Sequence, residues 1–557
     1  MILGIDVGGT HTDAVLIENF KIKRKAKVPT NPDNLLSSLL NVTQDLLKDE
    51  NPEKLQRVVL STTISTNAIV QKKTDRVGMI LAGGPGIGPA RLAVGEDCHF
   101  VSGYVNHRGI EAANVNDEEI VRIGEHFRAE GIDHVGIVGK FSVRNPIHEI
   151  RIRDRLQDAT GHLSLGHRMS GHLNFPRRIA TTYLNASIAG LYSRFVEEVL
   201  NFVRHQGISV PIYILKADGG TFDIRHSLEF PVQTILSGPA ASIMGVLSMS
   251  NCKQDAIALD IGGTTTDIAI FAGGAPLLEA FGVNIEGHKT LIRGLRTKSI
   301  GLGGDSCIRI DRGRLSIGPD REGPAAAFGG PCPTPTDAMI VLGLTGIGKR
   351  DRAEQALLPI AEKMNCSLTD VAQLIFEKAC QIIVDQVRNV IEEINNQPVY
   401  TIHEMLDGKK IQPKILYVVG GPAEPMAPRL GQLLDCQVHI PEHPEVANAI
   451  GAALARTTAE ITILADTEQK ILSIAEEGCR EAISPHFSRD DAIRIGREKL
   501  RETAIRMGAK EEDLEMEVIE SQEFNMVRQF YTTGKNIRVK LQVKPGLISG
   551  FRAGEPL

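Results

Sequence analysis

The chain has 557 residues, of which 42% are hydrophobic and 23% charged, and its formal net charge is −6. This length exceeds what one hydrophobic core supports, so several domains are expected. The slight negative charge argues against a nucleic-acid partner, and no apolar run is long enough to cross a bilayer, so no membrane partner is expected either.

The start of the chain and its cysteines predict a soluble cytoplasmic protein. Met1 leads directly into the first predicted strand, which leaves no room for a signal peptide. The eight cysteines are scattered without any C-x-x-C pair, a spacing that favours buried or idle thiols over a disulfide framework, a zinc ribbon or a cysteine-held cluster. Such thiols are typical of a reducing compartment.

The first part of the chain alternates between strand and helix patterns, an order typical of α/β folds. A polar run at 61–67 predicts the capped start of a further helix. The apolar patterns predict strands at 2–6, 13–18, 22–28, 57–61, 76–82 and 134–139 and helices at 33–49, 117–129, 147–159 and 178–206.

The second part of the chain is predicted to restart with a strand at 212–215. The elements that follow are helices at 238–249, 351–364, 367–395, 425–434, 444–457 and 489–507 and strands within 256–271 and at 414–419, 514–520 and 536–543. The pattern predicts three units: an N-terminal domain at 1–180 with an insertion, a second domain at 181–480, and a small α+β element at 481–557.

One nine-residue phrase occurs twice, as IDVGGTHTD at 5–13 and as LDIGGTTTD at 259–267, with six of nine positions identical. Each copy predicts a buried strand, a tight glycine turn and a returning strand. Such a turn directs several backbone N–H groups toward one point and forms an anion site. The two copies therefore indicate two related half-molecules whose phosphate loops face each other.

With a late apolar strand that ends in Gly420-Gly421, the two hairpins resemble the actin, sugar-kinase and heat-shock-chaperone ATPase superfamily. A more specific set of phrases resembles the ATP-dependent A-type subunits of the hydantoinase/oxoprolinase family. Besides the repeats, these phrases are STTISTNA at 61–68, TILSGPAA at 234–241, SIGLGG at 299–304 and PTDA at 335–338. The resemblance covers about residues 2–460. It implies an α/β fold of two ribonuclease-H-like (actin-like ATPase) domains, related by the internal repeat, that close over ATP.

The resemblance implies a nucleotide site shared between both hairpins and the late strand end. The first hairpin would contact the terminal phosphate, the second the inner phosphates, and the strand end the adenosine. The residues implied to bind ATP are Asp6, Gly8, Gly9, Thr10, Thr12, Asp260, Gly262, Gly263, Thr264, Thr265, Gly303, Gly304, Gly420 and Gly421. Mg²⁺ prefers oxygen ligands and keeps water, so one or two carboxylates suffice, and Asp6 and Asp260 are the candidate ligands.

Asp13 and Asp267 each stand seven residues after those carboxylates, across the turn. Either one fits a general base or a group that orients water, and each equally fits a carboxylate that caps the turn. Both interpretations stay open. The hydroxyl and amide groups of the 61–67 run also fit two interpretations, contacts in the nucleotide cleft or ordinary helix caps.

Several positions depart from the resemblance or imitate another site. His11 stands where the family usually carries an aromatic residue, and Asp305 where a third glycine or a serine is usual. Residues 297–298 are Thr-Lys where a His-Thr pair is common. The segment at 343–350 nearly spells a P-loop, but Arg350 replaces the required Ser or Thr, so no site is expected there. Of sixteen histidines, only His11 and His288 lie in or near a motif.

The resemblance implies ATP-driven activation of the carbonyl of a cyclic amide, such as a hydantoin, oxoproline or a similar lactam, for ring opening. It also implies a separate B-type partner subunit that completes the reaction; a homo-oligomer stays open. Three other functions remain: a small-molecule kinase of the same superfamily, a subunit of an ATP-dependent ketone carboxylase, and a regulatory ATPase.

Overall fold

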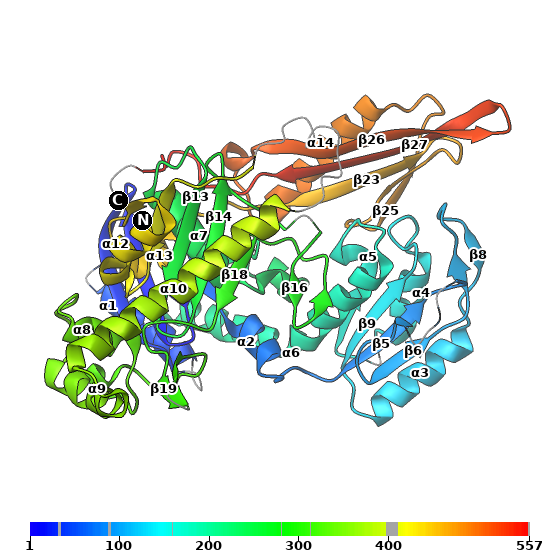
Figure 1. Cartoon of the computed structure of the whole chain (residues 1–557). Coiled ribbons are helices and arrows are strands. Elements are labelled where there is room, and N and C mark those ends of the chain that lie inside the picture. The colour runs from blue at the N-terminus through cyan, green and yellow to red at the C-terminus, as the bar shows by residue number, and fades with distance from the viewer. Residues whose placement is uncertain are drawn as a thin grey trace.

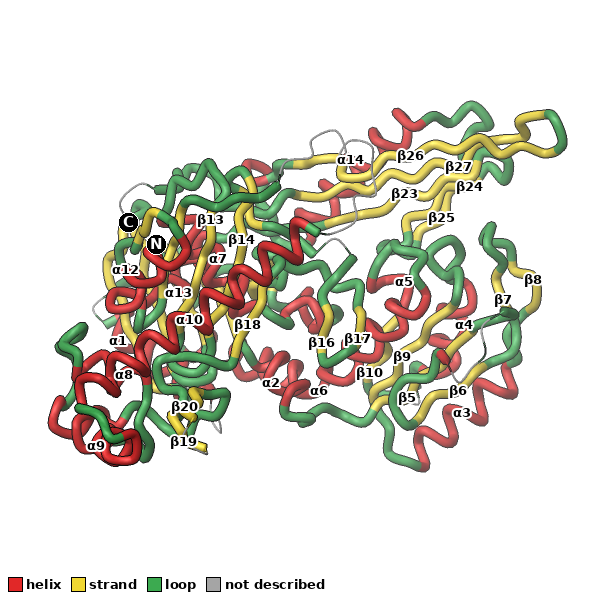
Figure 2. Tube along the Cα trace, viewed as in Figure 1, coloured by secondary structure: helices red, strands yellow, loops and turns green. Residues whose placement is uncertain are grey.

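The computed structural model describes residues 1–31, 35–48, 50–86, 88, 91–158, 160–279, 281–311, 314–396 and 410–554. Figures 1 and 2 show four β-sheets of four or more strands, with helices packed on them. Within the described residues, no helix is both long and apolar enough to cross a membrane.

The first sheet is built around the N-terminal strand. Its order is β12-β11-β4-β1-β2-β3, with β1 antiparallel to β2 and parallel to β4. The strands are β1 (Ile2–Val7), β2 (His11–Glu18), β3 (Lys21–Pro29), β4 (Arg57–Thr62), β11 (Ile212–Leu215) and β12 (Thr221–Asp223). Strands β1 and β4 are buried along their whole length, as continuous apolar runs in parallel sheets require. Helices α1 (Leu35–Leu47) and α6 (Phe175–His205) cover one face.

The second sheet repeats the topology of the first. Its order is β15-β14-β13-β21-β22, with β13 antiparallel to β14 and parallel to β21, and β18 also pairs with β14. The strands are β13 (Ala256–Ile261), β14 (Thr266–Ala272), β15 (Ala275–Pro276), β18 (Thr297–Ile300), β21 (Ile415–Val419) and β22 (Gln437–His439). Helices α10 (Leu368–Asn395) and α12 (Ala423–Leu434) pack on one face. This repeat confirms the predicted pair of ribonuclease-H-like domains.

Two further sheets flank this pair. One is the insertion, of order β10-β9-β5-β6; the other lies near the C-terminus, of order β25-β24-β23-β27-β26, and ends in a long hairpin that projects from the body (Figure 1). The insertion holds β5 (Val77–Ala82), β6 (Asp97–Phe100), β9 (His134–Gly139), β10 (His162–Leu165), α3 (Asp117–Ala129), α4 (Ile147–Leu156) and α5 (Gly166–Met169). The C-terminal unit holds β23 (Glu460–Asp466), β24 (Ile471–Ile474), β25 (Cys479–Ala482), α14 (Arg489–Arg506), β26 (Met516–Arg528) and β27 (Tyr531–Val543).

The remaining elements are short or connect the sheets. They are α2 (Ile64–Val70), α7 (Ser237–Met249), α8 (Pro335–Val341), α9 (Arg350–Met364), α13 (Ala447–Leu454), β7 (Tyr104–Val105), β8 (Glu111–Ala113), β16 (Asn284–Ile285), β17 (His288–Lys289), β19 (Ile308–Asp311) and β20 (Arg314–Ile317).

The structure differs from the sequence prediction at the borders between units. The strand at 212–215 pairs with β4 and so completes the first sheet, where the sequence predicted the start of a second half. The C-terminal sheet already begins with β23 at Glu460, because β23 pairs with β27. The sheets therefore divide the chain later than 180 and earlier than 480. Sequence patterns report local periodicity, whereas these pairings join residues 70 or more positions apart.

Helix α13 packs between the two repeated halves, and glycines permit its close approach. A Cβ at Gly4 of β1 would lie 2.3 Å from the carbonyl oxygen of Ala449, and a Cβ at Gly451 would lie 2.2 Å from that of Ala241 on α7. Gly245 of α7 has the same constraint against Ala447. One short helix thus packs on β1 and on α7 through close backbone contacts, and any side chain at these glycines forces it away.

We therefore expect Gly451→Ala to destabilise the protein by about 1–3 kcal/mol, since overpacking a close backbone contact displaces it. The measurement is the melting temperature, which should fall by about 1–3 °C in a chain of this length. Gly346→Ala is the matched control, because a Cβ there meets nothing within 4 Å. Equal melting temperatures for the two variants would contradict the close packing of α13.

Candidate functional site

The first Gly-Gly-Thr turn joins β1 to β2 at an edge of the first sheet. Gly8 N donates to His11 O at 3.1 Å, which closes the turn. Asp6 lies opposite Asp13 in the antiparallel pair, so both carboxylates stand on one face. A Cβ at Gly9 would meet nothing within 4 Å, and the residue is exposed, so its backbone is accessible to a ligand.

The second turn joins β13 to β14 and repeats this geometry. Gly262 N donates to Thr265 O at 2.9 Å, and Asp260 lies opposite Asp267. Thr265 is exposed, and Gly262 and Gly263 are half-buried. The two copies of the repeated phrase therefore share turn hydrogen bonds and strand register as well as amino-acid sequence.

The two hairpins lie close enough for their charges to interact. Burial raises the pKa of Asp6 to about 7, with further contributions from the carboxylates of Asp13 and Asp260. Burial also raises the pKa of Asp260. Asn448, on α13, donates through Nδ2 to Asp6 Oδ2 at 3.2 Å. The amide of Asn448 also lowers the pKa of Asp260, against the effect of burial. The two predicted carboxylates are thus coupled electrostatically, with one amide hydrogen-bonded to Asp6.

The predicted Gly303-Gly304 pair supports the second hairpin from behind. Gly304 N donates to Gly262 O at 2.9 Å, and Asp305 N donates to Gly263 O at 2.7 Å. Both Gly303 and Gly304 are buried. Their observed contacts are with the turn, which they hold in place.

The predicted Gly420-Gly421 pair lies at the end of β21, beside Asp260. Gly420 has φ +98°, and a Cβ there would lie 2.8 Å from Asp260 Oδ1 and closer still to Ile261 O, so glycine is required. Gly421 is exposed and has open space around its Cα. The end of β21 is therefore open next to the second carboxylate.

Asp13 and Asp267 are both held by neighbours on their own half. Lys27 Nζ donates to Asp13 Oδ2 at 2.9 Å, and Ser299 Oγ donates to Asp267 Oδ1. Burial raises the pKa of Asp13 against the lowering effect of Lys27. Burial raises the pKa of Asp267 to about 7, and the Asp260 carboxylate adds to this. Asp260 and Asp267 also line a cavity of about 10 Å³, the size of one water molecule.

Other predicted residues lie at the hairpins in different ways. Thr12 is buried, and its hydroxyl contacts that of Thr30, which in turn donates to Gly8 O, so Thr12 braces the turn. Thr10 and Thr264 are half-buried in their turns. His11 is exposed as a residue. Partial burial of its ring lowers the pKa of His11, and the positive charges of Lys27 and Arg321 lower it further.

Two sequence candidates lie outside the hairpins. His288 belongs to β17, with its ring 6.1 Å from that of Tyr183. The P-loop-like segment at 343–350 joins α8 to α9, with no strand before it. Neither supplies a group to the two hairpins among the described contacts.

Sequence reasoning missed three side chains of the site: Lys27, Ser242 and Asn448. Ser242 on α7 donates to Asp260 Oδ2. The row of basic residues on the strand at 22–28 was the only signal for Lys27, and no motif marked the other two. Their roles depend on how α7 and α13 pack, which the linear sequence does not display.

The carboxylates fit a hydrated divalent cation. Two buried carboxylates of like charge are unfavourable together unless protons or a cation neutralise them. Asp6 Oδ1 is buried without a hydrogen-bond partner among the described residues, which leaves an oxygen free for such a ligand. Mg²⁺ takes oxygen ligands and keeps most of its water. Asp6 and Asp260 would hold it.

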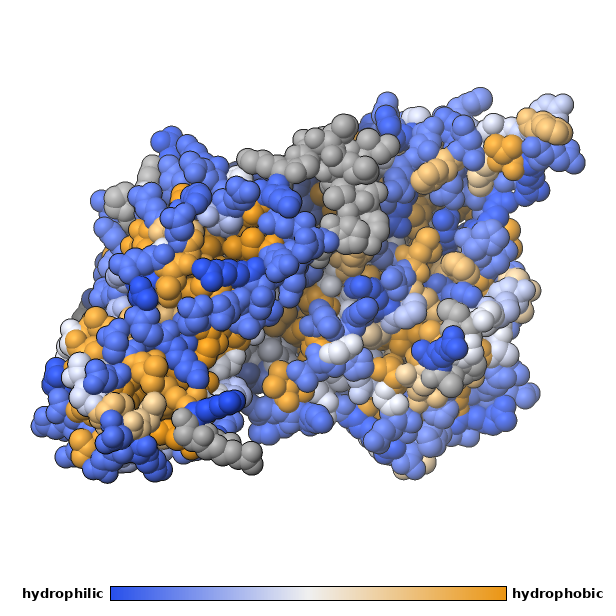
Figure 3. All heavy atoms as spheres, viewed as in Figure 1, coloured by the Kyte–Doolittle hydropathy of each residue, from blue (hydrophilic) through white to orange (hydrophobic). Residues whose placement is uncertain are grey.

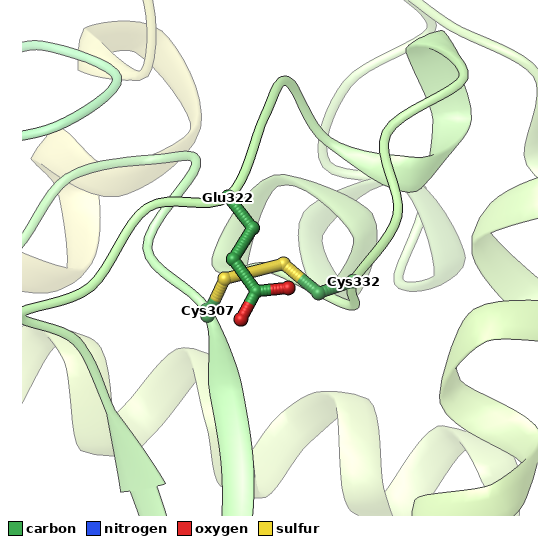
Figure 4. Close-up of side chains that lie close together, drawn as sticks. All are labelled: Cys307, Glu322 and Cys332. Carbon is green, nitrogen blue, oxygen red and sulfur yellow. A yellow bond between two sulfur atoms is a disulfide. The ribbon is translucent and has the colours of Figure 1, made fainter.

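Cys307 and Cys332 form a disulfide, so the prediction that all eight cysteines are free is wrong. Cys307 follows the 303–306 loop, and Cys332 precedes Thr336, whose backbone N and hydroxyl both donate to Gly304 O. The bond therefore ties two supports of the second hairpin together. The partners are 25 residues apart and meet only because the chain folds back, which spacing alone did not reveal. Figure 4 shows Glu322 beside the two sulfur atoms, which are bonded to each other and so offer no thiolate to a metal.

The amino-acid sequence matches two models of one protein family. The family model described as hydantoinase/oxoprolinase matches residues 178–461, and that for the N-terminal region of the same family matches residues 2–160. An uncharacterized protein of Methanocaldococcus jannaschii is 25% identical over 541 residues, 86% of this chain and 77% of that protein.

Two relatives carry functional names. The caprolactamase subunit alpha of Pseudomonas jessenii is 27% identical over 62% of this chain, and the acetophenone carboxylase gamma subunit of Aromatoleum aromaticum is 24% identical over 61%. The matches span only 55% and 53% of those two proteins.

Two solved structures share the fold. The nucleotide-free acetone carboxylase structure has a TM-score of 0.74 at 18% identity, covering 100% of this chain and 88% of that chain. The ATP-dependent caprolactamase of Pseudomonas jessenii has a TM-score of 0.71 at 21% identity, covering 97% and 87%.

The raised pKa of Asp267 predicts a pH-dependent stability. The folded protein keeps this proton up to about pH 7, while the unfolded chain releases it near pH 4, so the free energy of unfolding falls as pH rises between these values. From pH 5 to pH 7 the loss is on the order of 3 kcal/mol. Asp267→Asn has no such proton, so its melting temperature should fall less than that of wild type between pH 5 and pH 8. An equal fall in melting temperature for Asp267→Asn and wild type would contradict the raised pKa of Asp267.

Removal of the disulfide should destabilise the support of the second hairpin. A cross-link that closes a loop of this length contributes about 3 kcal/mol by restricting the unfolded chain. We expect the Cys307→Ser, Cys332→Ser double variant to melt at a lower temperature than the oxidised wild type, and a reducing agent to lower the melting temperature of wild type alone. If the reducing agent lowers the melting temperatures of wild type and the double variant equally, the disulfide does not account for the stabilisation.

Proposed function

Because the chain belongs to the hydantoinase/oxoprolinase family, we propose that it is an ATP-dependent subunit that activates the carbonyl of a cyclic amide for ring opening. The observation that carries this proposal is the pair of Gly-Gly-Thr hairpins whose Asp6 and Asp260 carboxylates are coupled across the two halves. A protein without a P-loop meets the charge of ATP with backbone dipoles and a cation. The turn N–H groups would supply the dipoles, and the two carboxylates would hold the cation.

In the proposed reaction the amide oxygen attacks the γ-phosphorus of ATP, and ADP leaves. The phosphorylated carbonyl carbon is then more electrophilic, so water adds to it and the ring C–N bond breaks, with the nitrogen leaving as the amine. A second water hydrolyses the resulting acyl phosphate to the carboxylate and free phosphate. The chain supplies position and charge neutralisation, because the transition state for phosphoryl transfer is loose and needs little covalent help.

Each half has a part in this proposal. The turn N–H groups around Gly9 and Gly263 would bind phosphate oxygens, and the open strand end at Gly421 would receive the adenosine. Mg²⁺, when bound by Asp6 and Asp260, would neutralise charge on the phosphate oxygens. Asn448 would orient the Asp6 carboxylate, to which it donates a hydrogen bond. Asp267, beside a cavity of one water, would orient that water or hold the turn.

A partner subunit is part of the proposal. Relatives are named as subunits of a caprolactamase and of an acetophenone carboxylase. The tip of the β26–β27 hairpin carries exposed apolar side chains, with Phe530 96% and Phe524 60% exposed (Figure 3). Exposed apolar groups at a projecting tip are typical of a protein contact.

A ketone carboxylase subunit is the second candidate, because one relative bears that name. In that case the acceptor is a ketone, and activation precedes attachment of carbon dioxide. The nucleotide site is the same in both proposals, so the acceptor distinguishes them.

The test is phosphate release from Mg·ATP across hydantoins, oxoproline, neutral lactams and ketones, with and without a B-type subunit from the same genome. We expect turnover that requires both a cyclic amide and the partner. Asp260→Asn should lower the rate at least about a hundredfold, since a cation ligand contributes several kcal/mol. Asp435→Asn is the matched control, because its carboxylate is 91% exposed.

Two outcomes would contradict the proposal. A stable phosphorylated small molecule without free phosphate would identify a kinase. Turnover that depends on a ketone and bicarbonate, and on no amide, would identify the carboxylase.

A further inference from the structure

A second polar cavity lies away from the two hairpins, where four parts of the chain meet. Its volume is about 70 Å³, enough for several water molecules or a compact organic acid. The walls come from the end of the insertion, the loop after β11, the segment at 291–293 and the C-terminal unit. The charged lining residues are Arg168, Lys216, Asp218, His226, Arg293, Glu460, Glu476, Glu477 and Arg506.

The centre of this cavity is a buried cluster of two cations and one carboxylate. Lys216 Nζ and Arg293 Nη1 each lie 3.5 Å from Asp218 Oδ2. Asp218 already accepts hydrogen bonds from Gly220 N and from the Thr458 hydroxyl, both at 2.9 Å. One carboxylate therefore faces two positive charges, and the cluster carries an excess of one.

The other acids of the wall have partners. Glu476 accepts from Gly171 N and from Thr462 Oγ1, both at 2.9 Å. Glu477 accepts from the hydroxyl of Thr503 at 2.8 Å and from Arg506.

Glu460 lies between two cations. Lys540 Nζ is 2.9 Å from its Oε2, and Arg293 Nη1 is 4.0 Å from the same atom. This ion pair lowers the pKa of Glu460 to about 2 in spite of its burial. Four cationic and four acidic side chains line the cavity, so the wall as a whole is balanced in charge, and Arg293 is shared between Asp218 and Glu460.

Polar atoms of both kinds in the wall lack a hydrogen-bond partner among the described residues: the acceptor Glu460 Oε2, two guanidinium nitrogens and one ring nitrogen. Arg293 Nη2 and Arg168 Nε are buried without a hydrogen-bond partner among the described residues, as is His226 Nε2. A buried donor without a partner costs about 1–3 kcal/mol. Burial lowers the pKa of His226, so its ring is neutral and can donate from one nitrogen. A group that accepts hydrogen bonds would satisfy Arg293 Nη2 and Arg168 Nε.

We infer that this cavity binds a small carboxylate-bearing molecule, with its carboxylate on Arg293 and Lys216. A guanidinium with a free Nη2 suits a carboxylate, since both groups are planar and can form paired hydrogen bonds. The ammonium of Lys216 donates once, to Thr458 O at 2.9 Å, and has further protons to offer.

The position of the cavity relates it to the first hairpin. Lys216 directly follows β11, which pairs in parallel with β4, and β4 pairs in parallel with β1. The carboxyl ends of parallel strands meet at one edge of a sheet, and neighbouring strands are about 4.8 Å apart. The bound acid would therefore lie at the sheet edge that carries Gly8, two strands away. The role of the bound acid as the phosphoryl acceptor rests on the proposed function. The binding of the acid in this cavity does not.

The test is calorimetric binding of three acids, each paired with a neutral counterpart of similar shape. The pairs are 5-oxoproline with 2-pyrrolidinone, glutarate with glutaramide, and propanoate with propanamide. We expect at least one acid to bind the wild type and its counterpart to bind at least tenfold more weakly. Because no nucleotide is present, this result is independent of phosphate release.

Two variants at one position test the residue assignment. Arg293→Gln should weaken binding of the acid at least tenfold, and Arg293→Lys should also weaken it, since it keeps the charge and loses Nη2. Arg494→Gln, an exposed arginine on α14, is the matched control and should bind as wild type does. Unchanged binding of an ATP analogue verifies that a variant is folded. If Arg293→Gln does not fold, the acid affinity of Arg293→Lys tests the assignment of Arg293.

Three results would overturn the inference. They are the failure of all three acids to bind below about 10 mM, equal binding of acids and neutral counterparts, and acid affinity that the folded Arg293 variant leaves unchanged. Each leaves the proposed ATP site intact, because amide-dependent phosphate release would persist.

Discussion

The structure depends on two buried carboxylates of like charge that lie close together. Asp6 and Asp260 end equivalent strands of the two halves, and the charge of Asp260 contributes to the raised pKa of Asp6. Two such groups without a compensating charge oppose folding. Asn448 donates to Asp6 Oδ2, and Asp6 Oδ1 has no hydrogen-bond partner among the described residues. A site that is unfavourable when empty and favourable with a cation is what binding of Mg·ATP requires.

The rest of the fold holds these two groups in position. Helix α13 carries Asn448 and approaches β1 and α7 through glycine contacts, so a displaced helix would separate the amide from Asp6. Behind the second turn, Gly304 and Asp305 donate to its carbonyl groups, and the Cys307–Cys332 bond ties the two segments that meet at Gly304. The site is thus rigid on the side of the second half, whereas Gly9 and Gly421 stay open.

The repeated phrase predicted the core of the site because one local pattern contains the strand, the turn and the carboxylate. It anticipated the cross-strand pairs of Asp6 with Asp13 and of Asp260 with Asp267, and with them the doubled ribonuclease-H-like topology. It did not predict Asn448, Ser242 or the disulfide, because each joins segments that are distant in the chain. The strand at 212–215 was placed in the wrong half for the same reason: β-pairing is nonlocal, and its partner β4 lies about 150 residues earlier.

The central claim is that Asp6 and Asp260 hold one shared cation on the phosphates of one nucleotide. A double-mutant cycle tests it most directly, with the affinity of a nonhydrolysable ATP analogue measured for wild type, Asp6→Asn, Asp260→Asn and the double variant at saturating and zero Mg²⁺. If the cation is shared, either single substitution removes most of the Mg²⁺-dependent affinity, and the double variant loses little more. Losses that add, or that are the same without Mg²⁺, would contradict a shared cation.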